Sequence, residues 1–314
     1  WPPDRFYTAK LSEQLDRHSK SNHTEFSLEP NIKISPGGLR DIQTILWVAQ
    51  RHYGTNDLLK LTALGFLKQD EAETLLAAQR FLWHVRFILH MISNRDENRL
   101  LFDNQRNLAR HLGYQDGDQL AVEQFMQDYY RQAQAVSTIN EILLQHFDEQ
   151  VVGSRTKAVI KPINARFQSY NDFLEVSVES VFHDHPEALL EMFVILGSSP
   201  NLKGIRASTI RLARYHATSI DENFRQNSIN TKLFLDLLRV EHHLFSQLRR
   251  MIRYGILSAY MPEFERVIGQ MQFDLFHIYT VDAHTLQVVR NMRRFRYKDQ
   301  KQKFPIAAHI YQRL

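Results

Sequence analysis

The sequence predicts a mainly α-helical protein, with long helical bundles and one small β element. Only 11 glycines and nine prolines occur in 314 residues, and 24% of the residues are charged, a composition typical of helical proteins. Apolar residues recur three and four positions apart through residues 75–92 and 122–147, as they do along the buried face of a helix. Residues 26–34 instead alternate between apolar and polar side chains, which is the period of a strand.

The spacing of apolar residues predicts helices over most of the chain. The expected helices cover residues 4–19, 75–92, 122–147, a segment beginning at Pro186, 208–216, 231–241 and 244–253. The spacing is lost over 151–162, which we interpret as a linker. Asn140 is the one polar residue in the apolar seam of 122–147. Burying an unpaired amide costs about 1–3 kcal/mol, so we expect Asn140 to find a hydrogen-bond partner or to lie near the surface.

The alternating stretch is expected to be an edge strand. Its polar residues Glu29, Asn31 and Lys33 would then share one face. Pro30 cannot donate a hydrogen bond within a sheet, which favours an edge position or a bulge. The strand should end at Ser35-Pro36-Gly37-Gly38, and apolar spacing from Ile42 onward predicts that a helix follows.

A glycine turn before a helix is open to two interpretations. The free backbone N–H groups at the helix start, with Lys33 before them and Arg40 after them, would suit a phosphate group. Paired glycines after a strand also serve simply as tight turns, and motif matches of this length carry false positives. The residues of the turn alone favour the simple turn.

Residues 28–45, LEPNIKISPGGLRDIQTI, closely resemble the LEPxIKxSPGGLRDIxTLxW segment of the uridylyltransferase/uridylyl-removing enzymes that modify the PII nitrogen-signalling protein. A looser version occurs in glutamine synthetase adenylyltransferases. The resemblance continues through residues 1–14, 100–114 and 259–286, so it covers nearly the whole chain. It implies the edge of a nucleotidyltransferase domain (1–40), a helical bundle (41–150), a second helical linker region (151–263) and the first helices of a truncated HD phosphohydrolase domain (264–314). The small β element would be what remains of the nucleotidyltransferase sheet.

The resemblance also implies an activity for the parent protein. This is transfer of UMP from UTP to a tyrosine of PII, and hydrolytic removal of that UMP, under control by glutamine and with Mg²⁺ or Mn²⁺. The family supplies two metal-binding carboxylates from an Asp-x-Asp strand after Gly-Ser. The single Asp-x-Asp here is Asp116-Gly117-Asp118, in a glycine turn where Asp118 is expected to cap a helix. We therefore expect an excerpt whose transferase site is incomplete and which is inactive alone.

The resemblance assigns roles to residues around the glycine turn. Glu29 would be a catalytic, metal-facing carboxylate, and Lys33 a catalytic and nucleotide-binding cation. Gly37, Gly38 and Arg40 would also bind the nucleotide. The alternative is that Glu29 and Lys33 form only the solvated face of an edge strand. Relatives often carry an aspartate where this chain has Asn31, so a ligand at that position would be missing.

A second metal site is implied near the end of the chain. Residues 279–286, YTVDAHTL, look like the entry to an HD-type domain, and His284 matches its first metal ligand. A His-Asp doublet should follow, but none does before Leu314, so this site is also expected to be incomplete. His183-Asp184-His185 resembles a metal motif but precedes His284, and we interpret it as a helix cap.

Composition excludes several classes of function. The chain has no cysteine, hence no disulfide or thiolate site, and a reducing cytoplasm is the simplest setting. No apolar run approaches the roughly 18 residues that span a bilayer. The basic run over 290–303 suits nucleic acid or a solvated face, and we favour the latter. We therefore expect neither a nucleic-acid nor a membrane partner. Two alternatives stay open: an adenylyltransferase relative, which should lack the His284 segment, and a non-catalytic helical scaffold that binds PII or joins two domains.

Overall fold

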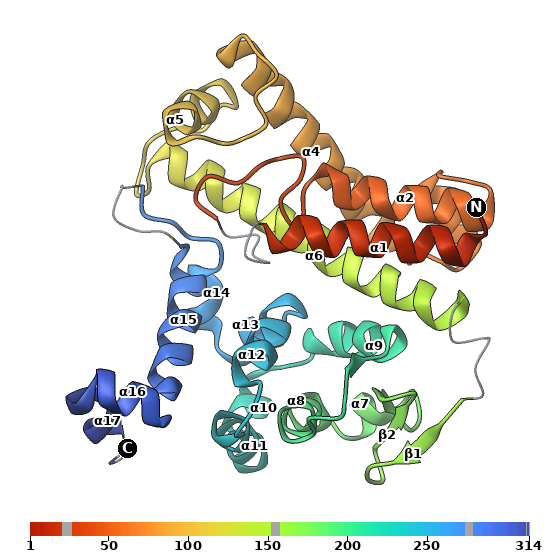
Figure 1. The fold of residues 1–314 in the computed structure, drawn as a ribbon, viewed down its shortest axis with the longest axis vertical. Helices are drawn as coiled ribbons and strands as arrows, with labels where there is room; N and C mark the ends of the chain where they lie inside the picture. The colour runs from red at the N-terminus through yellow and green to blue at the C-terminus, as the bar shows by residue number, and fades with distance from the viewer. Residues whose placement is uncertain (21–26, 152–157, 274–278, 312, 314) are drawn as a thin grey trace.

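A computed structural model describes residues 1–20, 27–151, 158–273, 279–311 and 313. Its first part is a bundle of six helices around one hydrophobic core, with α6 running through its centre (Figure 1). The helices are α1 (Pro3–Ser19), α2 (Leu39–Tyr53), α3 (Leu58–Ala63), α4 (Gln69–Ser93), α5 (Phe102–His111) and α6 (Ala121–Val151). The predicted helices over 4–19, 75–92 and 122–147 are confirmed.

The apolar seam of α6 forms the centre of this core. Every apolar residue predicted for the seam, from Val122 to Phe147, is buried. Asn140 is buried as well, and it exchanges two hydrogen bonds with Gln14 of α1, at 3.1 and 3.2 Å. The expectation that this amide finds a partner is confirmed, and the pair fixes how α1 lies along α6.

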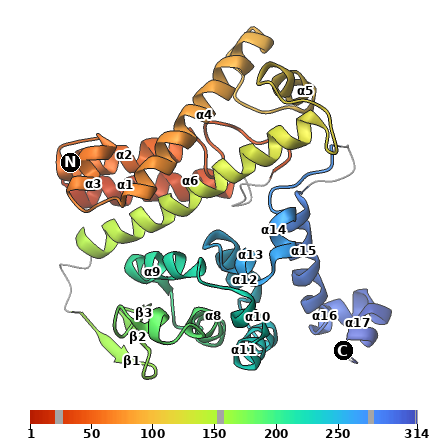
Figure 2. The same ribbon diagram turned by 180° about the vertical axis from the view of Figure 1, so that it is seen from behind.

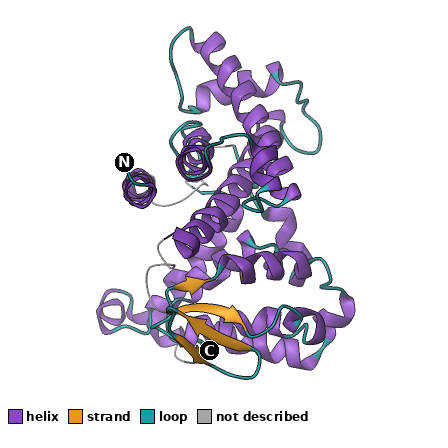
Figure 3. Cartoon of the chain, turned by 90° about the vertical axis from the view of Figure 1, so that its right-hand side faces the viewer, coloured by secondary structure: helices purple, strands orange, loops and turns teal. Residues whose placement is uncertain are grey.

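A small sheet follows α6, and the sequence analysis did not predict it. Its strands are β1 (Ile160–Pro162), β2 (Phe167–Tyr170), β3 (Phe173–Val176) and β4 (Gly204–Ile205), in that order across the sheet (Figure 3). The first three pair antiparallel, and β4 joins β3 in parallel. Strands of two to four residues are too short for alternation to be recognised. The predicted linker over 151–162 therefore overlaps β1, and residues 152–157 lie outside the described part.

Eleven helices in the described residues make up the rest of the chain, most of them around a second hydrophobic core (Figure 2). They are α7 (Val181–Asp184), α8 (Ala188–Ser198), α9 (Ala207–Ala217), α10 (Glu222–Gln226), α11 (Ser228–Arg239), α12 (Leu244–Arg253), α13 (Ile256–Tyr260), α14 (Pro262–Val267), α15 (Val281–Arg294), α16 (Lys298–Lys303) and α17 (Pro305–Tyr311). The predicted helices after Pro186 and over 208–216, 231–241 and 244–253 correspond to α8, α9, α11 and α12.

The two cores are joined through α6 and α4. Ile142 of α6 belongs to the second core. Glu71, at the start of α4, is 2% exposed and accepts two hydrogen bonds from Arg211 of α9, at 2.9 and 2.8 Å. A bidentate arginine–carboxylate pair of this kind fixes direction as well as distance. Tyr7, Leu28 and others from residues 1–40 pack into the first core, and the domain boundary placed at residue 40 stays a prediction.

The basic run near the end of the chain has structural contacts. Arg293 donates to the carbonyl oxygens of Leu238 and Val240, and Arg296 donates to that of Glu241. Cationic side chains favour the carboxyl end of a helix, here α11, because its last carbonyls lack partners. Among the described residues, no helix is both long enough and apolar enough to cross a membrane.

Candidate functional site

Residues 27–34 form an irregular loop, so the predicted edge strand is wrong. Only two isolated bridges occur, one joining Ser27 to Tyr279 and one joining Asn31 to Arg99. The loop coils because the side-chain oxygen of Asn31 accepts from the backbone N–H groups of Lys33 and Ile34, both at 3.0 Å. Such local side-chain bonds compete with strand formation. Phe26, the first residue of the predicted strand, lies outside the described residues.

Glu29 contacts the start of α5. Its Oε1 accepts from the backbone N–H of Phe102 at 3.1 Å, and its Oε2 lies 3.6 Å from the guanidinium of Arg99. A carboxylate is stabilised at this end of a helix because the first N–H groups are unpaired and carry partial positive charge. The carboxylate predicted to face a metal therefore has a structural role. Its metal-binding role stays a prediction.

Lys33 lies at the edge of a charged cluster and is half-buried. The centre of this cluster is Asp96, which accepts from Asn98 at 3.0 Å and lies 3.2 Å from His90 and 3.3 Å from Arg86. The hydrogen bond from Asn98, followed by the charges of His90, Arg86 and Lys33, lowers the pKa of Asp96. The structure shows no ion pair between Lys33 and Glu29, although both residues are described.

Gly37 is required by the packing of the turn against α6. Its φ is +77°, and a Cβ atom built there would lie 2.0 Å from the carbonyl oxygen of Ala133. Gly38 is similarly enclosed, because its Cβ would lie 2.7 Å from the carbonyl oxygen of Ile32. Gly37 therefore allows the loop to approach α6 more closely than any side chain permits, and Gly38 allows the loop to fold tightly on itself.

The backbone N–H groups of this turn all have partners. Gly37 donates to Asp41 at 2.7 Å, Gly38 to Ser35 at 2.9 Å, Leu39 to Ile32 at 3.0 Å and Arg40 to Lys33 at 2.8 Å. These bonds agree with the favoured interpretation of a simple turn, because the amides that could have bound a phosphate already have partners. Nucleotide binding by residues of this turn stays a prediction, and it now depends on the side chains of Lys33 and Arg40.

Asp41 is the principal residue of this region that sequence reasoning missed. It is completely buried, and it accepts from Gly37, from Arg17 at 2.8 Å and from His18 at 3.0 Å. Arg17 also donates to the carbonyl oxygen of Ile34. A buried charge is stable only when it is paired and hydrogen-bonded. The sequence contained one signal for this role, which is the position of Asp41 in the first turn of α2. An acidic residue at that position often accepts from the N–H groups that precede the helix.

Arg40 lies on the surface between α1 and α2. Its guanidinium is 5.1 Å from the ring centre of Trp47 and 3.9 Å from Glu13. Lys10 approaches the same ring at 4.7 Å and donates to Glu13, which lowers the pKa of that carboxyl. Arg40 therefore belongs to a surface cluster with aromatic and acidic partners.

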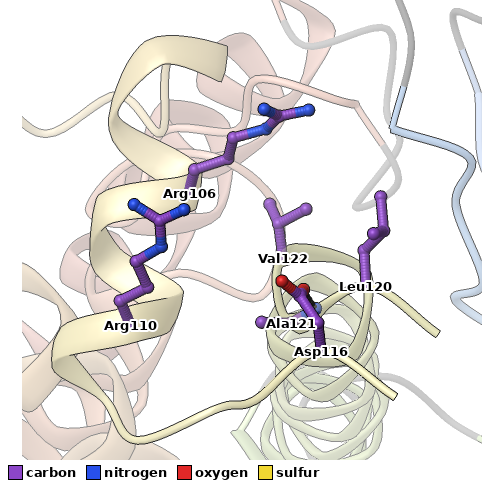
Figure 4. A pocket seen from close by; sticks show the side chains of 6 residues that line it. All are labelled: Arg106, Arg110, Asp116, Leu120, Ala121 and Val122. Atoms are coloured by element: carbon purple, nitrogen blue, oxygen red, sulfur yellow. Dashed lines mark hydrogen bonds between the residues drawn. The ribbon is translucent and has the colours of Figure 1, made fainter. Parts of the chain in front are cut away.

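A separate pocket of about 100 Å³ lies between α5 and the start of α6. Arg106 and Arg110 line one side of it, opposite Asp116 and Val122 (Figure 4). Asp116 accepts from the N–H of Ala121 at 2.8 Å and so caps α6. The cap expected at Asp118 is therefore at Asp116. None of the predicted site residues lines this pocket.

His284 is exposed on the first turn of α15, where it has no acidic or histidine partner within 4 Å among the described residues. Asp282, two residues before it, is buried and accepts from the N–H of Gly269, and burial raises its pKa to about 6. The ring of His183 lies 2.9 Å from Asp184. The first N–H groups of α8 receive no hydrogen bond from a capping side chain, so the capping role expected for His183-Asp184-His185 is wrong. The described residues contain no group of three acidic or histidine side chains that could hold a metal ion.

Comparison with known proteins identifies the family. A model described as GlnD PII-uridylyltransferase matches residues 5–144, and one described as the third domain of uridylyltransferase GlnD matches residues 167–260. A bifunctional uridylyltransferase/uridylyl-removing enzyme of Pseudomonas aeruginosa is 50% identical over the whole chain. The chain belongs to the GlnD uridylyltransferase family. Similar enzymes of Pseudomonas savastanoi pv. phaseolicola and Pseudomonas putida are 49% identical over the same span. The chain covers 35% of the length of each of these relatives, and no solved structure matches it.

The resemblance read from the glycine turn is thus confirmed. The residues predicted for the site do not lie together in the structure. Glu29 lies at α5, Lys33 near Asp96, Arg40 over Trp47 and His284 on α15. These residues alone do not assemble a site for Mg²⁺ or Mn²⁺, which would need several oxygen ligands around one point.

Proposed function

We propose that these residues are part of a bifunctional GlnD enzyme that transfers UMP from UTP to a tyrosine of PII and removes it by hydrolysis. The observation that carries the proposal is the 50% identity to a bifunctional uridylyltransferase/uridylyl-removing enzyme across the whole chain, together with the two family models in chain order. We further propose that the full-length protein works in the cytoplasm, responds to glutamine and uses Mg²⁺ or Mn²⁺, which would bridge the phosphates of UTP.

Within this function, Lys33 is the residue of the glycine turn best suited to contact UTP. It is half-buried, and its ammonium has no hydrogen bond or ion pair within 4 Å among the described residues. A fixed cation beside the triphosphate stabilises the charge that develops during transfer. Glu29, by contrast, is already bound to Phe102 and Arg99. The metal-binding carboxylates are accordingly proposed to come from the rest of the enzyme.

The test is to measure incorporation of labelled UMP from UTP into purified PII, with Mg²⁺ or Mn²⁺. Full-length enzyme should be active, and the 314-residue chain alone should show neither incorporation nor release of UMP from modified PII. In the full-length enzyme, Lys33→Gln should lower the rate of incorporation roughly 100-fold. Lys60→Gln, which changes an exposed lysine of α3, is the matched control and should leave the rate unchanged.

Four results would contradict the proposal. Activity of the 314-residue chain would show that its site is complete. An unchanged rate in Lys33→Gln would remove that residue from the site. Transfer of label from ATP to glutamine synthetase would favour the adenylyltransferase alternative, and binding of PII without any transfer by the full-length protein would favour the scaffold.

A further inference from the structure

Three large apolar side chains form an exposed ridge on α4. Trp83 is 55% exposed, Phe87 64% and Met91 66%. Because they are four residues apart on a helix, they lie one above another on a single face. The opposite face, which includes Leu82 and Leu89, is fully buried in the first core. Single exposed apolar residues are ordinary, but a contiguous apolar face marks an interaction surface.

We propose that the α4 ridge (Trp83, Phe87 and Met91) is covered, in the full-length protein, by a part of the same enzyme that lies outside residues 1–314. The chain covers 35% of the length of its relatives, yet it matches them over its whole length. The larger part of such an enzyme is therefore available to pack on this bundle. One end of α4 rises to the top of the molecule in Figure 1, near α5.

The charges around the ridge indicate the chemistry of the covering surface. Arg80 and His84 are exposed on the same part of α4, and neither has a carboxylate within 4 Å among the described residues. Arg95, just beyond the end of the helix, is also exposed and lies 2.7 Å from Glu97. Opposite charges at the rim of an interface favour correct docking. The covering surface should thus be apolar at its centre and carry carboxylates at its rim.

The same charges disfavour a second copy of this chain as the occupant. If two copies of α4 packed antiparallel about Phe87, Arg80 of each copy would lie close to Arg95 of the other. In a parallel arrangement, each Arg80 and each His84 would face its own counterpart. Like charges directly opposed across an interface are destabilising. Cover by a different surface of the same enzyme avoids this repulsion.

A cysteine-labelling experiment tests the proposal, since the 314 residues contain no cysteine. Phe87→Cys is introduced into the 314-residue chain and into the full-length enzyme, and the rate of maleimide labelling at that site is measured by peptide mass spectrometry. We expect labelling at least roughly tenfold slower in the full-length enzyme, because the site must be uncovered before it reacts. Met91→Cys should behave in the same way, which guards against an effect peculiar to one substitution.

Tyr215→Cys is the matched control. Tyr215 is 74% exposed on α9, and the residues four positions away on either side, Arg211 and Ser219, are polar. Its labelling rate should be the same in both proteins. Equal rates for Phe87→Cys in the two proteins would overturn the proposal. So would slow labelling in the 314-residue chain accompanied by a dimeric mass, which would identify a second copy as the occupant. Because labelling does not measure uridylyl transfer, neither result would bear on the proposed function.

Discussion

Gly37 and Gly54 lie at the two ends of α2. Comparing alanine substitutions at these two positions measures how much the close packing of the glycine turn affects stability. Gly37 precedes the helix with φ +77°, and Gly54 ends it with φ +74°. A Cβ at Gly54 would meet nothing within 4 Å, whereas a Cβ at Gly37 would lie 2.0, 2.5 and 2.7 Å from the oxygen, carbonyl carbon and Cα of Ala133. Substituting alanine at each position therefore imposes the same backbone conformation in two different surroundings.

The two substitutions should differ in how much they lower the free energy of unfolding, because only the alanine at position 37 meets Ala133. Holding alanine in the left-handed conformation costs about 1–2 kcal/mol, and this should be the whole effect of Gly54→Ala. At Gly37 the loop and α6 must separate by about 1 Å to reach even the 3.0 Å that real Cβ atoms respect. Overpacking of this kind typically adds about 1–3 kcal/mol. We therefore expect Gly37→Ala to lower the free energy of unfolding by roughly 2–5 kcal/mol.

Urea denaturation of both variants, followed by circular dichroism, measures this difference. The midpoint should fall much further for Gly37→Ala than for Gly54→Ala, with the slope of the transition unchanged. Equal midpoint shifts would refute the reasoning, because they would show that the turn moves away from Ala133 at no cost. A changed slope would mean that the variant alters the unfolded state or the cooperativity of unfolding, and the two midpoints could then not be compared.

Three further predictions concern charged groups. Asp41→Asn leaves the guanidinium of Arg17 without its buried counter-charge. Urea denaturation should therefore show a loss of about 3–5 kcal/mol, and a loss below about 1 kcal/mol would contradict the burial of this cluster. Glu29→Gln keeps an acceptor at the start of α5 but removes its charge, so the same measurement should show a loss of about 0.3–1 kcal/mol, and an unchanged stability would mean that the contact contributes nothing. Burial lowers the pKa of His146 in the folded protein. The unfolded chain therefore binds a proton at this histidine more readily, so the contribution of His146 to stability is present above the unfolded pKa of about 6.5 and is lost as the pH falls. The stability of the native protein, compared with His146→Gln, should therefore decrease between about pH 7.5 and 5.5, and parallel pH profiles would count against this.

Long-range periodicity predicted the helical part of the fold well, because each helix buries one continuous apolar face. The seam of α6 and the stripe of α4 were visible in the sequence for this reason. The sheet was not, since β2 and β3 have four residues each and are held by pairing with each other. The loop at 27–34 was misread because Leu28 and Ile32 are buried as isolated anchors, and two buried residues four apart also satisfy an alternating pattern.

The candidate site shows why a sequence motif predicts the fold more easily than it predicts which residues take part in a reaction. In the segment from Glu29 to Asp41, most polar groups already have structural partners: Asn31 closes the loop on itself, and Asp41 holds the glycine turn through buried bonds. A sequence cannot separate a residue that is required for packing from one that is required for reaction, because both are fixed in place by the same fold. The structure helps to separate them by showing which side chains already have hydrogen-bond or ion-pair partners among the described residues. Glu29 and Asp41 have such partners, whereas Lys33 only lies near Asp96. For this reason the proposed contact with a nucleotide is assigned to Lys33.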